Sequence, residues 1–114
     1  MDKIAALREI LNLDPGNAFA RYGLAMELAQ SDPEAALAEF STLIARSPDY
    51  VPAYQMSAQT MIRLGRPADA LTRLHAGIAA ANRTNNQHAL AEMEALREEL
   101  ASGVAADPAS GARN

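Results

Sequence analysis

The sequence predicts an all-α fold, a helical solenoid of antiparallel helix pairs, from three observations. Small and large apolar residues return at a nearly constant offset of 33–34 residues along most of the chain. Within each segment the apolar residues follow helical spacing, and proline, glycine or asparagine separates one segment from the next. No alternating run of β-branched residues and no Asn-Gly turn indicates a sheet. A fixed period of this length is typical of stacked helical hairpins, because one hairpin alone cannot bury its apolar face.

The first three helices are expected at residues 2–13, 18–30 and 33–46. Asn17 can cap the second of them, since its side chain can accept a hydrogen bond from an unpaired backbone N–H. Asp32 followed by Pro33 is a helix start, because proline in the first turn lacks an N–H that would be unpaired there. The apolar stripes are Ile4, Leu7, Ile10 and Leu11; Leu24, Ala25 and Leu28; and Ala36, Leu37, Phe40, Leu43 and Ile44.

The next two helices, expected at residues 51–64 and 67–83, repeat the second and the third. Pro52 is tolerated in a first helical turn, and Gly65 with Pro67 separates the two helices. A sixth helix is expected at residues 87–101. The remaining residues, 102–114, carry almost no large apolar side chain and are expected to form a flexible tail after a domain of residues 1–101. The repeated positions are Pro33 and Pro67, Ala36 and Ala70, Phe40 and Leu74, Pro15 and Pro48, and Ala25 and Ala58.

These positions together resemble the tetratricopeptide repeat (TPR) family. One copy reads Leu24-Ala25, Leu28, Ala36, Phe40 and Pro48, and the next reads Tyr54, Ser57-Ala58, Met61, Gly65, Ala70, Leu74 and Asn82. An incomplete copy precedes them, with Lys3, Leu7 and Pro15. The resemblance implies a right-handed solenoid of about two TPR motifs, with a preceding half repeat and a C-terminal capping helix.

The chain departs from the family pattern at four places. Arg21 stands where the family prefers an aromatic residue, and Lys3 replaces a small residue at a helix contact. Asn82 replaces the terminal proline, which allows the fifth helix to run longer. One residue is missing between Ala25 and Pro33 relative to the second copy, which shortens the first turn within a repeat.

Composition excludes several classes of site. The chain has no cysteine, so it has no disulfide framework and no thiolate metal site. Its net charge of −4 argues against nucleic-acid binding through phosphate contacts. No run of 18 apolar residues predicts a membrane span, and without a signal-peptide pattern we expect a cytoplasmic location. His75 and His88 lie far apart without partner ligands, and no serine has a neighbouring histidine. We therefore expect neither a cofactor, a metal nor an enzyme activity.

The resemblance implies that the first helix of each pair lines a concave groove that binds a protein or peptide partner. We expect an apolar or amphipathic segment there, with Arg63 or Arg97 pairing a carboxylate. Phe19 and Tyr22 have an equally weighted alternative role, packing in the core against Ile4, Leu7 and Leu11. The predicted groove residues are Phe19, Tyr22, Met26, Gln55, Gln59, Ile62, Arg63, Met93 and Arg97.

Two further expectations concern the class of partner. Some TPR domains grip the acidic C-terminal tails of chaperones with Lys, Arg and Asn, but the matching positions here are Tyr22, Met26, Met56 and Gln59. The clamp is absent, so a chaperone-tail receptor is not predicted. The alternative function is a self-assembling scaffold, a homodimer formed through the open N-terminal end or through a swapped last helix.

Overall fold

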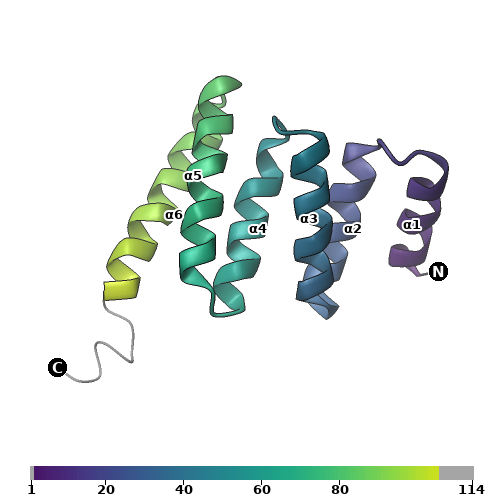
Figure 1. Ribbon diagram of the computed structural model, residues 1–114, viewed down its shortest axis with the longest axis horizontal. Helices are drawn as coiled ribbons and strands as arrows, with labels where there is room; N and C mark the ends of the chain where they lie inside the picture. Colours follow the sequence, from purple (N-terminus) through teal and green to yellow (C-terminus); the bar gives the residue numbers. More distant parts are fainter. Residues whose placement is uncertain (1, 106–114) are drawn as a thin grey trace.

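The computed structural model describes residues 2–105 and consists there of six helices and no strand (Figure 1). Five helices begin and end within one residue of the expected bounds, and the all-α helical-repeat fold is confirmed. None of these helices is long and apolar enough to cross a membrane. The helices are α1 (Lys3–Leu13), α2 (Ala18–Ser31), α3 (Pro33–Arg46), α4 (Val51–Arg63), α5 (Pro67–Arg83) and α6 (Gln87–Ala105).

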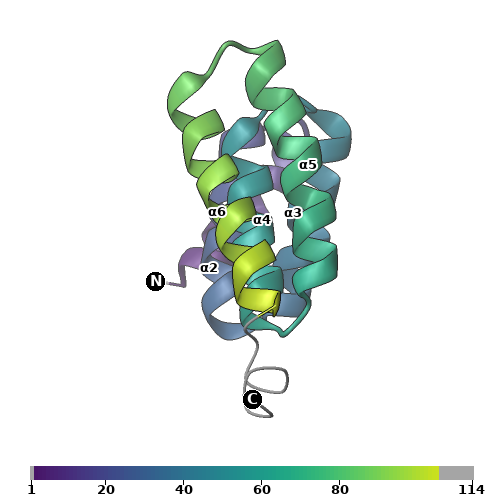
Figure 2. The same ribbon diagram turned by 90° about the vertical axis from the view of Figure 1, so that its left-hand side faces the viewer.

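Helices α2 to α6 form two layers, and α1 packs on α2. Each helix packs on its neighbour in sequence, and the closest pairs are α2 with α3 and α4 with α5. Helices α2, α4 and α6 lie in one layer, and α3 and α5 lie in the other (Figure 2). Helix α4 lies close to both α2 and α6. Between the other two helices, Arg66 at the start of α5 pairs with Glu34, and Arg73 donates to the Ser41 hydroxyl. We call the layer of α2, α4 and α6 the inner layer.

The turns follow from residues that end one helix and begin the next. Asp32 ends α2 and caps α3, with its side chain accepting from the backbone N–H of Ala35. Gly65 has a φ of 75°, and the N–H of Arg66 returns to the carbonyl of Met61 at 2.9 Å, which closes α4. Asn85 has a φ of 58° and closes α5 in the same way. The first repeat is one residue shorter between Ala25 and Pro33 than the second is between Ala58 and Pro67. Its two helices are therefore joined by the single residue Asp32 instead of a turn with a left-handed residue.

The core lies where the two layers meet. The four alanines at the repeated positions, Ala25, Ala36, Ala58 and Ala70, are fully buried. Small side chains there let the paired helices approach closely. The large residues Phe40, Leu43 and Leu74 are also buried, and Ile44 packs against the apolar clusters of both repeats. The structure thus has two buried apolar clusters, which the half-buried Ile44 bridges.

Helix α6 is longer than predicted and starts later in the repeat. It continues to Ala105, four residues beyond the expected end at 101, and the rest of the predicted tail lies outside the described residues. Helix α5 has 17 residues where α3 has 14. As a result the starts of α4 and α6, Val51 and Gln87, lie 36 residues apart, whereas Ala18 and Val51 lie 33 apart. The period of the first two repeats therefore does not extend to α6.

Candidate functional site

A depression of about 440 Å³ lies on the inner layer and involves all three of its helices. Its walls combine thioether and aliphatic side chains with two primary amides, and Arg63 is its one cation. No acidic side chain lines it. The lining residues are Met26, Ala29 and Gln30 from α2; Met56, Gln59, Thr60, Ile62 and Arg63 from α4; and Leu96 from α6.

A second depression, of about 300 Å³, adjoins the first. It lies between α4 and α6, and Gln59 and Leu96 line both depressions. Its charged side chains are Glu92 and Glu99, and no cation lines it. We call the two depressions together the inner groove. The residues of the second are Gln55, Gln59, Glu92, Ala95, Leu96 and Glu99.

Five of the predicted groove residues line the inner groove: Met26, Gln55, Gln59, Ile62 and Arg63. They lie together because α2 and α4 start 33 residues apart, the offset that relates these positions in the sequence. Arg63 has a second role, since its Nη2 donates to the carbonyl oxygen of Ala29 at 2.8 Å. It therefore ties α4 to α2 as well as bordering the apolar depression.

Tyr22 and Phe19 lie outside the inner groove. The Tyr22 ring packs between Phe40 and Tyr50, with ring centroids 6.2 and 5.4 Å away. Burial, with a smaller contribution from Tyr50, raises the pKa of Tyr22 above its ordinary value. Phe19 keeps 79% of its surface exposed at the start of α2. Tyr22 thus contributes to the packing of the first repeat. Its aromatic neighbours lie on α3 and just after it, whereas the core role considered from the sequence placed it against Ile4, Leu7 and Leu11 of α1.

Met93 and Arg97 need correction. Met93 is fully buried, and a Cβ added to Gly77 would lie 2.6 Å from its sulfur. Arg97 is half-buried and lines neither depression. The physical reason is the longer α5, because a 34-residue offset from Gln59 points to Met93, whereas the observed 36-residue offset points to Ala95. The prediction missed Glu92, Leu96 and Glu99. A 36-residue offset leads to them from Met56, Thr60 and Arg63, of which only Arg63 was a predicted groove residue.

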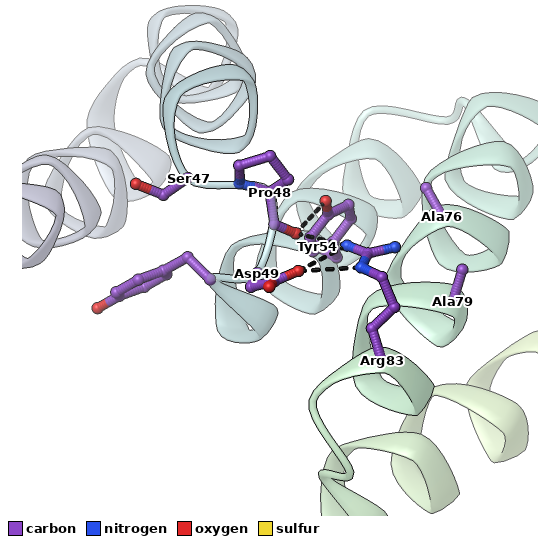
Figure 3. A pocket seen from close by; sticks show the side chains of 8 residues that line it. Ser47, Pro48, Asp49, Tyr54, Ala76, Ala79 and Arg83 are labelled. Carbon is purple, nitrogen blue, oxygen red and sulfur yellow. Dashed lines mark hydrogen bonds and ion pairs between the residues drawn. The ribbon is translucent and has the colours of Figure 1, made fainter.

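A larger cleft, of about 790 Å³, lies between the α3–α4 turn and α5 (Figure 3). Its polar side chains bond to one another, because Arg83 pairs with Asp49 at 2.8 Å and also donates to the carbonyl of Pro48. Tyr54 donates to that same carbonyl at 2.6 Å. These contacts fasten the α3–α4 turn to α5, so we assign the cleft to the junction between repeats. Within residues 2–105, no group of three acidic or histidine side chains is placed to hold a metal.

Comparison with known proteins agrees with this architecture. A family model described as the tetratricopeptide repeat matches residues 27–93. A solved tetratricopeptide repeat domain protein from Salinibacter ruber is 34% identical, with a TM-score of 0.72 over 76% of this chain and 89% of that one. A Bordetella parapertussis protein (23% identical) has a TM-score of 0.80 over 94% of both chains, a likeness of fold.

One further structure comes from yeast. The TPR2B domain of yeast Sti1, solved as a pHsp70 complex, is 25% identical with a TM-score of 0.80 over 87% of this chain and 80% of that one. No curated protein matches the chain in sequence. The family match over more than half of the residues, the paired helices and the buried alanines at the repeated positions together show that this chain belongs to the tetratricopeptide repeat family.

Proposed function

We propose that the protein is a non-catalytic adaptor whose inner groove binds a segment of a partner protein. The observation that carries the proposal is the pair of adjoining depressions formed by three helices of the inner layer. The first has apolar walls on three sides, supplied by Met26, Met56 and Leu96. Such walls bury an apolar side chain of a partner, and methionine adapts its shape to the side chain it meets.

The amides in the groove suit an extended peptide. Gln30, Gln55 and Gln59 each carry one carbonyl and one NH₂ group, and none of these side chains makes a hydrogen bond within residues 2–105. A peptide main chain offers donors and acceptors in alternation, so side-chain amides can bind it whatever its sequence. The structural similarity to Sti1, solved with a pHsp70 partner, supports a peptide as the occupant class.

The experiment selects peptides from a phage-displayed library of random 12-residue sequences on the immobilised wild-type protein. The selected peptides are then measured by fluorescence polarisation against Met26→Glu, which places a charge in the apolar depression. The matched control is Ala38→Glu, which introduces the same charge at an exposed position of α3. We expect at least tenfold weaker binding to Met26→Glu and unchanged binding to Ala38→Glu, because an unpaired buried charge is costly.

Circular dichroism melts of both variants establish that they are folded, and amide chemical shifts locate the peptide. Shifts on α2, α4 and α6 support the groove. Equal binding to Met26→Glu, or shifts confined to α3 and α5, would overturn it. Tyr22 is unsuitable for this test, because its ring packs on Phe40 and Tyr50 and its removal would weaken the fold.

A homodimer is the second candidate, and one observation favours it. The exposed large apolar side chains of the described residues are Ile10, Leu13 and Phe19, with 43, 85 and 79% of their surfaces exposed. All three lie at the corner between α1 and α2, at the N-terminal end of the stack. Light scattering from micromolar to millimolar concentration tests the dimer, and Leu13→Gln with Phe19→Gln should abolish it. A monomer over that whole range excludes it.

A further inference from the structure

We propose that the inner groove selects segments in which a large apolar residue lies within about four positions of a lysine or arginine. The proposal rests on the proposed function and names the class of segment that the groove prefers. It follows from how charge is distributed between the two depressions. The first offers apolar walls, and the second offers two carboxylates, Glu92 and Glu99, without a cation.

The two depressions share a wall, which sets the spacing of the two side chains. Gln59 and Leu96 border both, so a peptide that places one side chain in each must cross only this pair. An extended peptide advances about 3.3 Å per residue, and neighbouring helices lie about 8–10 Å apart, so a separation of two to four residues spans the distance. The apolar and the basic residue therefore belong to one short motif.

The charged groups around the acidic depression leave the carboxylates available. Glu92 lies 3.3 Å from His88, with half of the Glu92 side chain exposed, and that contact is an ion pair only when His88 is protonated. Glu99 is exposed and has no ion pair within the described residues. Arg63 borders the apolar depression instead, where it donates to the Ala29 carbonyl. A cationic side chain would thus meet two carboxylates, whereas an acidic one would meet repulsion.

This preference differs from the sequence-based expectation on α6. The sequence predicts that Arg63 or Arg97 pairs with a carboxylate. Arg63 borders the apolar depression, whereas Arg97 lines neither depression and Glu92 and Glu99 take that part of α6. The correction has the same physical origin as that of Met93. The longer α5 turns a different face of α6 toward the groove, and that face is acidic.

The experiment compares peptide selection on the wild-type protein with selection on Glu92→Gln/Glu99→Gln. Glu94→Gln/Glu98→Gln is the matched control, because it removes the same charge from exposed positions of α6 that line neither depression. Wild type and control should enrich lysine or arginine within four positions of an apolar residue. The groove variant should keep the apolar preference and lose the basic one. For one selected peptide, the affinity should fall about 2- to 10-fold in the groove variant, as expected for two exposed ion pairs.

The outcomes separate this inference from the proposed function. Groove-directed peptides without basic enrichment, with acidic enrichment, or with unchanged affinity for Glu92→Gln/Glu99→Gln overturn the charge preference and leave the groove intact. Peptides that bind Met26→Glu as well as wild type overturn the groove itself. An affinity that decreases with added salt for wild type, but not for Glu92→Gln/Glu99→Gln, supports the inference independently, since salt screens exposed ion pairs.

Discussion

The two complete repeats, α2–α3 and α4–α5, make the same hydrogen bond to the preceding turn with different donor groups. In the second, Tyr54 donates to the carbonyl of Pro48 at 2.6 Å. In the first, the residue 33 positions earlier is Arg21, and it donates to the carbonyl of Pro15 at 3.1 Å. The prolines are also 33 residues apart. A departure from the family pattern at Arg21 therefore preserves the hydrogen bond to the preceding turn, although the donor changes from a phenol to a guanidinium.

The residues beside Arg21 and Tyr54 also differ between the two repeats. Arg21 pairs with Glu39 at 2.8 Å, and the side chains are 13 and 23% exposed. In the second repeat Arg73 takes the place of Glu39, beside Tyr54. Burial lowers the pKa of Arg73, and its Nη1 is buried without a hydrogen-bond partner in the part of the chain that the structure describes. The charge at the position of Glu39 and Arg73 is thus reversed between the repeats. The charged group of the first repeat has an ion-pair partner, whereas one nitrogen of Arg73 has no hydrogen-bond partner among the described residues.

The side chains at equivalent core positions of the two repeats also differ in volume. The first fills its core with its own Leu24 and Leu43, whereas the second has Ser57 and Gly77 at those positions. Tyr54 and Met93 fill the space that Gly77 leaves, because both approach within 2.6 Å of where a Cβ would lie. The period therefore fixes where side chains meet, while the neighbouring helices decide which of them supplies the volume.

The largest expected effect comes from giving the second repeat the residue of the first. Gly77→Leu copies Leu43 into a site where even a Cβ would collide with Tyr54 and Met93. We expect it to lower the free energy of unfolding by about 3 kcal/mol or more, and Gly77→Ala to lower it by about 1–2 kcal/mol after its gain in helix propensity. Urea denaturation followed by circular dichroism measures both variants.

Gly23→Ala is the control for that prediction. A Cβ added to this helical glycine would lie 3.5 Å from the nearest carbon of the Leu7 side chain, which is an ordinary contact distance. Alanine there should raise the free energy of unfolding by up to about 1 kcal/mol, because it restricts the unfolded chain. If both alanine variants change stability in the same direction, the interpretation of Gly77 as a filled space is wrong.

The next effect concerns the exchanged pair. Arg21→Tyr with Glu39→Arg gives the first repeat the pair of the second, Tyr54 and Arg73. Each single change should cost about 1–2 kcal/mol, because it leaves a half-buried charge without its partner. The double variant should recover at least about 1 kcal/mol of the summed loss, a coupling typical of residues in contact. Thermal or urea unfolding of the wild type, the two single variants and the double variant measures this coupling. Strictly additive losses would contradict the equivalence of the positions of Arg21 and Glu39 with those of Tyr54 and Arg73.

The sequence was sufficient for the fold, and it named several of the residues that line the two depressions. Helical spacing and proline positions located the helices, and the 33-residue offset placed Met26, Gln55 and Gln59 because α2 and α4 share one register. The α6 side of the groove was beyond that offset. The bounds of α5 and the start of α6 were predicted correctly, but α5 has three residues more than α3, so the starts of α4 and α6 lie 36 residues apart and the repeat offset of 33–34 residues does not carry over to α6.

Contacts between distant residues were also beyond the sequence. The Arg21–Glu39 pair joins positions 18 residues apart on different helices, and its equivalent in the second repeat has neither residue in common. A repeat pattern averages over such substitutions, so it marked Arg21 as a departure without revealing its partner. Only side-chain geometry shows that the departure is compensated.

The smallest expected effect tests the remaining difference, between Leu24 and Ser57. Ser57 is fully buried on α4, and its hydroxyl has no hydrogen-bond partner among the described residues. Ser57→Ala should therefore raise the free energy of unfolding by about 0.5–1 kcal/mol, since it removes an unsatisfied polar group and improves helix propensity. Thr60→Val is the matched control, because that buried hydroxyl donates to the Met56 carbonyl and its loss should lower stability slightly. A destabilised Ser57→Ala would mean that the hydroxyl is satisfied in solution, and that the second repeat keeps serine for a bond rather than for its small volume.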